Sequence, residues 1–250
     1  MLQDLHIHTT LCDGKNTPEE MVLSAIEKGV TRLGFSGHSY LSFDESYCMK
    51  KEDIPKYKKK IKYLKEKYKE KIEILCGIEQ DYFSEEKPEG YDYVIGSVHF
   101  VEVDGKPYEI DNTEEIFLKI VKEQFDGDFY SLAENYYELV GKVALKTKAD
   151  FIGHIDLITK FNEGYKHFDE THPRYVAAYK KAVDSIMPHC KVFEVNTVAI
   201  SRGYRLSPYP SKQIVDYILS SGGKLILNSD SHSVDTICYQ FDKWKHYLSL

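Results

Sequence analysis

Apolar residues gather in seven short runs that are spread along the whole chain. The runs occupy residues 4–8, 32–36, 72–78, 93–99, 151–154, 192–196 and 225–229. Each run is bounded by polar or glycine-containing segments, which is the pattern of a short buried β-strand. The sequence therefore predicts seven strands.

The segments between these runs show helical patterns. In residues 50–71, Ile54, Tyr57, Ile61, Leu64 and Tyr68 recur at three- and four-residue spacing, which predicts an amphipathic helix. The lysines of this segment alternate with glutamates, so we interpret them as a solvated helix face rather than a nucleic-acid surface.

Four helix starts are marked by capping residues. Thr17, followed by a proline and by Glu20, forms a capping box whose helix should end near Gly29. The other predicted starts are Ser131 with Glu134 as a second capping box, Thr171 followed by Pro173, and Ser211, whose helix should end at Gly222 and Gly223.

Strands and helices alternate from one end of the chain to the other. This order predicts a parallel sheet, either closed into a barrel or open and doubly wound. No glycine-rich dinucleotide fingerprint or Walker sequence follows any predicted strand, which favours the barrel. A length of 250 residues fits one α/β barrel, so we expect a single domain over residues 1–250.

Composition narrows the class of protein. With 42% hydrophobic and 29% charged residues and no long apolar run, no membrane span is expected, and the first residues lack a secretory signal, so we expect a cytoplasmic protein. The net charge of -7 argues against a nucleic-acid partner and favours a small-molecule substrate. The five cysteines form no C-x-x-C pair, so we expect them to be reduced.

Six of the ten histidines and three carboxylates lie at the ends of predicted strands. These nine candidates are His6, His8, Asp13, His38, Glu79, His99, His154, Asp230 and His232. In a parallel barrel the catalytic groups lie where the strands end, so we expect these side chains to share one site. We interpret the other four histidines, His167, His172, His189 and His246, as surface residues.

The spacing of these residues points to metal binding. His6 and His8 are two apart on a strand, so both imidazoles project to the same face and can chelate one ion. Asp230 and His232 repeat this spacing after the last strand, where their two groups could serve neighbouring ions. Imidazole and carboxylate donors without thiolates suit zinc, manganese or iron(II), and the sequence does not choose among them.

The order of these motifs resembles the polymerase and histidinol phosphatase (PHP) superfamily, and within it the monofunctional histidinol-phosphate phosphatases. The matching segments are residues 4–9 (DLHIHT), 12–14 (CDG), 36–38 (SGH), 77–79 (GIE), 95–99 (IGSVH), 153–158 (GHIDLI), 194–197 (EVNT) and 228–232 (NSDSH). The resemblance implies a distorted seven-stranded (β/α)7 barrel, similar to a TIM barrel, with a cluster of two to three divalent transition-metal ions.

The resemblance also implies which residues share each metal. One ion would take His6, His8, Glu79 and Asp230; a second would share Glu79 and add His99 and His154; the third would use Asp13, His38 and His232. Asp13 stands where some relatives carry histidine.

The activity that the resemblance implies is hydrolysis of L-histidinol phosphate to L-histidinol and phosphate, a step of histidine biosynthesis, by attack of a metal-bridging hydroxide on phosphorus. Basic residues in two loops, Arg202, Lys160 and Arg205, are the expected phosphate contacts. Glu194 and Asn196 are either groups that orient the metal ligands or polar members of the barrel layer.

Three alternatives remain open from the sequence. A related hydrolase could act on another small phosphoester or on nucleic-acid 3′ ends, and the chain could be a non-catalytic metal-binding module. A metal-dependent amidohydrolase also begins with an H-x-H strand, but it predicts a metal-bridging lysine at a strand end, and none of the seven predicted strand ends carries one.

Overall fold

A seven-stranded parallel sheet forms the centre of the protein in a computed structural model that describes residues 1–249. The strands, in the order in which they pair, are β1 (Gln3–Asp4), β2 (Arg32–Phe35), β3 (Glu73–Asp81), β4 (Tyr93–Ser97), β7 (Phe151–Ile152), β8 (Val192–Asn196) and β9 (Lys224–Asn228). Every neighbouring pair is parallel. The seven predicted strands are therefore confirmed, although β1 and β7 are shorter than expected.

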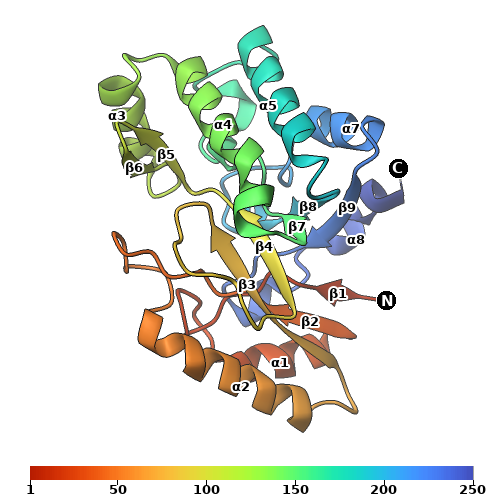
Figure 1. Cartoon of the computed structure of the whole chain (residues 1–250). Helices are drawn as coiled ribbons and strands as arrows, with labels where there is room; N and C mark the ends of the chain where they lie inside the picture. The colour runs from red at the N-terminus through yellow and green to blue at the C-terminus, as the bar shows by residue number, and fades with distance from the viewer. Residues whose placement is uncertain (250) are drawn as a thin grey trace.

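The first and last strands meet just beyond their ends. Ile7 and Ser231 form a parallel bridge, in which the Ser231 amide donates to the His6 carbonyl at 3.0 Å and the His8 amide donates to the Ser231 carbonyl at 2.8 Å. The sheet therefore curls into a nearly closed barrel, as Figure 1 shows. The predicted (β/α)7 barrel is confirmed, and the open doubly wound sheet is not observed in residues 1–249.

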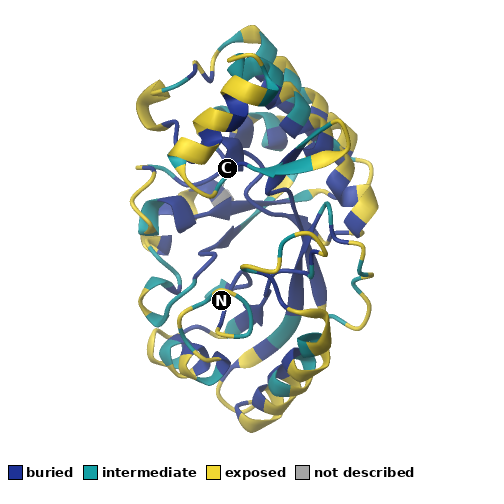
Figure 2. Ribbon diagram, turned by 90° about the vertical axis from the view of Figure 1, so that its left-hand side faces the viewer, coloured by how far each residue is buried: buried dark blue, intermediate teal, exposed yellow. Residues whose placement is uncertain are grey.

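Helices surround the barrel and bury their inner faces against it (Figure 2). They are α1 (Pro18–Glu27), α2 (Ile54–Lys67), α3 (Glu114–Gln124), α4 (Phe129–Thr147), α5 (Pro173–Ile186), α6 (Val198–Ser201), α7 (Lys212–Ser220) and α8 (Phe241–Trp244), with short 3-10 helices at Lys51–Asp53, Leu157–Thr159, Glu163–Tyr165, Val234–Thr236 and Lys245–Ser249. In Figure 1, α1 and α2 lie on one side of the barrel, and α4 and α5 on the opposite side. Among the helices of residues 1–249, none combines the length and the apolar character that a bilayer crossing requires.

Large apolar side chains fill the barrel between its strands. Leu5, Tyr93, Ile95 and Phe151 pack together there. The Tyr93 ring lies against Gly77, where an added Cβ would come within 2.2 Å of the ring, and its hydroxyl donates to the Leu5 carbonyl at 2.6 Å. The barrel is thus filled below the ends of its strands, so the polar side chains converge only at those ends.

The helix starts test the capping predictions. The Thr17 capping box is present in full, and Ser211 precedes α7 as expected. The second capping box was wrong: α4 begins at Phe129, and Asp128 caps it by accepting from the amides of Tyr130 and Ser131. Ser131 therefore lies inside the first turn of α4.

The start of α5 also differs from the prediction by one residue. His172, rather than Thr171, is the N-cap, and its side chain accepts from the Arg174 amide at 3.3 Å. His167 and His172 are half-buried rather than fully exposed, whereas His189 and His246 are exposed. All five cysteines are free, in agreement with the prediction.

The sequence patterns did not predict the excursion between β4 and α4. It consists of an antiparallel hairpin, β5 (Phe100–Val103) with β6 (Lys106–Glu109), followed by α3. Glu109 at the end of the hairpin, and Asp111 and Asn112 just after it, line a cavity at the carboxyl ends of the barrel strands.

Candidate metal centre

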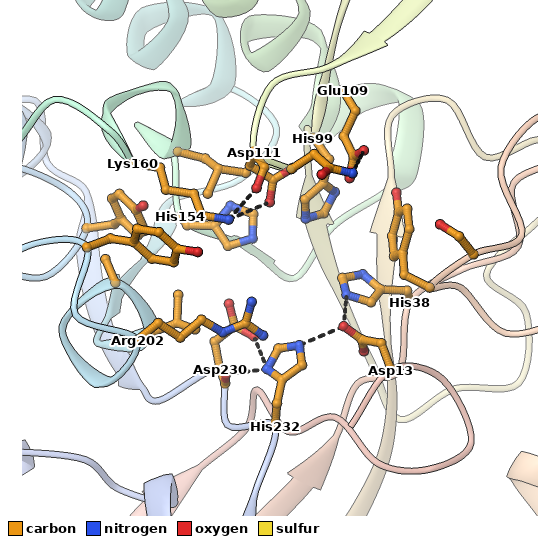
Figure 3. Close-up of a pocket in the computed structure, with 18 residues that line it drawn as sticks. Asp13, His38, His99, Glu109, Asp111, His154, Lys160, Arg202, Asp230 and His232 are labelled. Atoms are coloured by element: carbon orange, nitrogen blue, oxygen red, sulfur yellow. Dashed lines mark hydrogen bonds and ion pairs between the residues drawn. The ribbon is translucent and has the colours of Figure 1, made fainter. Parts of the chain in front are cut away.

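The nine predicted metal ligands meet at the carboxyl ends of the barrel strands (Figure 3). Six of the seven strands contribute. His6, His8 and Asp13 follow β1; His38 follows β2; Glu79 belongs to β3; His99 follows β4; His154 follows β7; and Asp230 and His232 follow β9. The structure therefore brings together side chains that are up to 226 positions apart in the chain, from His6 to His232.

Glu79 lies at the centre of this cluster. Its Oε1 is 3.0 Å from His154 Nε2 and 3.5 Å from His99 Nε2, while its Oε2 is 2.9 Å from His38 Nδ1 and 3.3 Å from His6 Nε2. The two oxygens of one carboxylate thus face different histidines. This arrangement suits a carboxylate that bridges two ions.

Asp230 completes the part of the cluster near the start of the chain. Its Oδ1 is 3.1 Å from His8 Nε2 and 3.6 Å from His6 Nε2. The backbone of Asp230 adopts a left-handed conformation with φ of 52°, which is uncommon for a residue other than glycine. This conformation turns the chain at the end of β9 beside the two imidazoles.

Asp13 lies in a second group of facing side chains, together with His38 and His232. Its Oδ2 lies 3.0 Å from His232 Nε2 and 3.7 Å from His38 Nε2. The loop that carries Asp13 folds back on the end of β1, and a Cβ at Gly14 would lie only 2.4 Å from the Thr9 amide nitrogen. Glycine at this position therefore allows the approach that brings Asp13 to the histidines.

The polar atoms of the cluster test whether metal ions fit. His6 Nε2, His8 Nε2, Glu79 Oε2 and Asp230 Oδ1 are buried and have no hydrogen-bond partner. Leaving such groups unpaired in a folded protein is costly. Three groups of donors lie within 4.8 Å of one another: His8, Asp13, His38 and His232; His6, His8 and Glu79; and His38, Glu79 and His99. The cluster therefore fits divalent cations.

The electrostatics of the cluster agree with this fit. Burial alone would raise the pKa of Glu79, but the surrounding histidines outweigh burial and hold that pKa well below its usual range. Asp230 behaves in the same way, with His6 and His8 as the main opposing groups. Both carboxylates are therefore charged at neutral pH and available as ligands.

A second layer of carboxylates orients the histidines. Glu194 accepts from His6 Nδ1 at 2.7 Å, so the prediction that it orients a ligand is supported by its geometry. Asp81 lies 2.8 Å from His99 Nδ1 in the same way. The sequence reasoning missed Asp81 because it ended the third strand at residue 78, whereas β3 continues to Asp81 and places it on the same side as Glu79.

A cavity of about 290 Å³ opens beside the cluster. Two of the three predicted phosphate contacts, Lys160 and Arg202, line it. In Figure 3, Lys160 lies next to Asp111, and Arg202 approaches from the side of Asp230 and His232. Lys160 is buried, and its ammonium donates to the Asp111 carbonyl.

The third predicted phosphate contact, Arg205, requires a correction. Its guanidinium is buried and donates to the Thr159 hydroxyl, and Arg205 is not among the residues that line the cavity. The loop turns between Arg202 and Arg205, because the amides of Tyr204 and Arg205 both donate to the Ala199 carbonyl. The two arginines therefore face different surroundings.

The protein is similar to several known proteins over nearly its whole length. It is 30% identical to a Deinococcus radiodurans protein named "Probable histidinol-phosphatase", with 96% of this chain and 90% of the relative covered. A Bacillus subtilis protein named "Histidinol-phosphatase" is 25% identical, with 96% of this chain and 97% of the relative covered.

Solved structures show the same fold. A Listeria monocytogenes protein whose crystal structure carries the name histidinol phosphatase superposes with a TM-score of 0.83 at 25% identity, covering 97% of this chain and 99% of that one. A Lactococcus lactis histidinol phosphate phosphatase, crystallised with zinc, L-histidinol and phosphate, superposes with a TM-score of 0.71 at 20% identity, covering 99% and 92%. The PHP domain family matches residues 4–198, and with these relatives it shows that the chain belongs to the PHP domain family.

Proposed function

We propose that the protein is a metal-dependent phosphomonoesterase that hydrolyses L-histidinol phosphate to L-histidinol and phosphate. The observation that carries the proposal is the convergence of nine imidazole and carboxylate side chains beside a cavity that Lys160 and Arg202 also line; five of the nine, His154 included, have an unpaired buried atom. The names of the full-length relatives from Deinococcus radiodurans and Bacillus subtilis support the choice of substrate.

The nine ligands would hold two to three divalent ions, of which zinc, manganese and iron(II) suit the donors. Bound there, such ions would supply a hydroxide at neutral pH and neutralise the charge on the phosphoryl oxygens. Glu79 would fix the spacing of the ions, since its two oxygens face different histidines. Glu194 and Asp81 would hold His6 and His99 with their free nitrogens directed into the site.

Lys160 and Arg202 would bind the phosphoryl oxygens from the side of the cavity away from His38. A planar guanidinium can donate two parallel hydrogen bonds to such a group, and an ammonium can approach it as a point charge. Lys160 would exchange its contact with the Asp111 carbonyl for the phosphate when substrate binds.

The acidic rim of the cavity suits the other end of the substrate. L-histidinol carries an amine and an imidazole, both of which are cationic when protonated. Glu109 and Asp111 line the cavity at the end of the β5–β6 hairpin, on the side of His99 and His154 (Figure 3). We infer that these carboxylates receive the cationic groups of the substrate, which would distinguish it from phosphate esters that lack them.

The test is phosphate release from L-histidinol phosphate, from an aryl phosphate and from a single-stranded DNA that carries a 3′-phosphate. The proposal expects a marked preference for L-histidinol phosphate. A cavity of about 290 Å³ suits a small ester rather than DNA, and the aryl phosphate lacks the cationic groups that Glu109 and Asp111 would receive. A preference for the DNA would instead support the nucleic-acid alternative, and equal rates on all three esters would remove the proposed substrate.

A pair of histidine variants tests whether the metal cluster performs the reaction. His8→Ala removes a buried ligand and should abolish phosphate release. His246→Ala changes an exposed histidine whose Nδ1 contacts only the Lys243 carbonyl, so this control should keep wild-type activity. Equal activity of the two variants would favour a non-catalytic role for the cluster.

A further inference from the structure

A second cluster of charged side chains lies behind the wall of the cavity, with Arg205 at its centre. Arg205 is 7% exposed, and its guanidinium donates to the Thr159 hydroxyl. Its Nε is 3.9 Å from Glu163 Oε2, and its Nη2 is 4.0 Å from Glu170 Oε1. Its Cζ also lies 5.6 Å from the centre of the Tyr209 ring, which lines the cavity.

Two carboxylates of this cluster, Asp156 and Glu170, are buried, whereas Glu163 is exposed. Asp156 is fully buried; its Oδ2 accepts from the Ser211 amide at 2.8 Å, and its Oδ1 has no hydrogen-bond partner. Glu170 is 2% exposed and accepts from Asn162 Nδ2 at 3.0 Å. Arg205 is thus the cation that balances two buried carboxylates, and such a charge tolerates little displacement.

These contacts join the turn that carries Arg202 to the connection between β7 and α5, which carries Lys160. Thr159 immediately precedes Lys160, and Arg202 lies three positions before Arg205 in the turn that follows α6. Glu170 lies in the segment that leads into α5. The guanidinium of Arg205 therefore connects the turn that carries Arg202 to the segment that carries Lys160.

We propose that Arg205 is a positioning residue, which fixes the loops of Lys160 and Arg202 so that both cations meet the phosphate without touching the phosphate itself. This role rests on the proposed function, since it takes the phosphoryl group as the ligand of Lys160 and Arg202. It replaces the direct phosphate contact that the sequence suggested for Arg205.

The planar guanidinium is the property that this role requires. It reaches the Thr159 hydroxyl and comes within 4.0 Å of both Glu163 and Glu170, three residues spread along the connection between β7 and α5, whereas an ammonium is a point charge that cannot span them. A shift of about 1 Å in a group that positions the substrate can cost about 100-fold in rate. Loss of the guanidinium should therefore weaken phosphate binding at a distance.

The first experiment compares Arg205→Lys with Arg174→Lys, a control on α5 whose arginine forms ion pairs with Asp128 and Glu134 away from the cavity. Calorimetry of inorganic phosphate binding to the metal-loaded protein should give a Kd about tenfold higher for Arg205→Lys, and KM should rise more than kcat falls. Metal content should equal that of the wild type. The control should leave all of these values unchanged.

The second experiment asks through which residues Arg205 acts. In a Lys160→Ala, Arg202→Ala background, Arg205→Lys should change kcat/KM by less than about twofold, because the cations that it positions are gone. A full tenfold loss in that background would overturn the positioning role. If the wild-type protein released phosphate from no monoester, both the proposed function and this role would fail. If the wild type hydrolysed the substrate normally, but the losses from Arg205→Lys and from the Lys160→Ala, Arg202→Ala background were additive, only the role of Arg205 would be overturned.

If Arg205→Lys does not fold, two smaller substitutions at Thr159 test the same role. Thr159→Val removes the hydroxyl that accepts from Arg205 and that donates to the Asp156 carbonyl at 2.8 Å, and it should raise the phosphate Kd in the same direction. Thr159→Ser keeps a hydroxyl and should restore the wild-type Kd. A wild-type Kd in Thr159→Val would contradict the coupling between Arg205 and the Lys160 loop.

Discussion

Glu194→Gln is the change whose consequence follows most directly from the hydrogen bonds around the metal cluster. Glu194 accepts from four donors: its Oε1 from His6 Nδ1 at 2.7 Å and from Asn228 Nδ2 at 3.0 Å, and its Oε2 from the His154 amide at 3.0 Å and from Asn196 Nδ2 at 2.8 Å. Glutamine has the same shape, but one of its two terminal atoms is an NH2 group. In either orientation that NH2 faces two donors.

Two buried hydrogen bonds are therefore lost in the variant, and each unsatisfied buried group costs about 1–3 kcal/mol. The free energy of unfolding should fall by about 2–4 kcal/mol once partial relaxation is allowed for. Because His6 then faces either an NH2 group or a neutral amide oxygen in place of the carboxylate that orients its ring, metal affinity and kcat/KM should each fall about 10- to 100-fold.

The assays are urea unfolding, titration of the metal with a competing chelator, and steady-state phosphate release. Glu138→Gln, on the exposed face of α4, is the matched control. It should leave the free energy of unfolding within about 0.5 kcal/mol of the wild type, and the metal affinity and kcat/KM within about twofold. If Glu194→Gln bound metal and released phosphate as the wild type does, the claim that Glu194 orients His6 would have to be abandoned.

Four further predictions follow from the site and its surroundings. Asp81→Asn should lower kcat/KM at least about tenfold, because Asp81 accepts from the Phe83 amide through Oδ1 and from His99 through Oδ2, so the NH2 group of asparagine must face one of these donors; an unchanged rate would remove Asp81 from the site. Gly14→Ala should reduce metal content, measured by elemental analysis, because the added Cβ displaces the loop that carries Asp13. Burial raises the pKa of Glu170 from 4.5 to about 7, so its neutral form stabilises the fold below pH 4.5 and this contribution, about 3 kcal/mol, is lost as the pH rises through 7. Between pH 5 and pH 8, the free energy of unfolding measured with urea should therefore fall less in Glu170→Gln than in the wild type. An equal fall in the two proteins would contradict the shifted pKa. Removal of metal with a chelator should abolish phosphate release and lower the Tm, and both should return when zinc, manganese or iron(II) is restored.

The barrel and the convergence of the nine candidate ligands could be predicted because both are encoded in short stretches of sequence. Buried parallel strands are short apolar runs, and the residue type at each strand end can be read directly. His6 and His8 needed only the two-residue period of a strand to be placed on one face. Asp81 could have been found with the same period, had the third strand been extended beyond Glu79.

Other features depend on contacts that short patterns do not contain. The β5–β6 hairpin has few apolar residues in its second strand, KPYE, so it resembles a loop in the sequence. The start of α4 was misplaced because Asp128 and Ser131 are both good capping residues, and the structure uses the earlier one. Arg205 is buried against the connection between β7 and α5, which is distant in sequence, so its spacing from Arg202 alone suggested a phosphate contact.

The central claim is that the nine side chains form one polynuclear metal site, and anomalous diffraction tests it most directly. Crystals grown with manganese or zinc should show two to three anomalous peaks, each within about 2.0–2.3 Å of at least two of the proposed ligands, with two of the peaks beside Glu79. A map without peaks among these side chains, from protein that still releases phosphate from L-histidinol phosphate, would contradict the account.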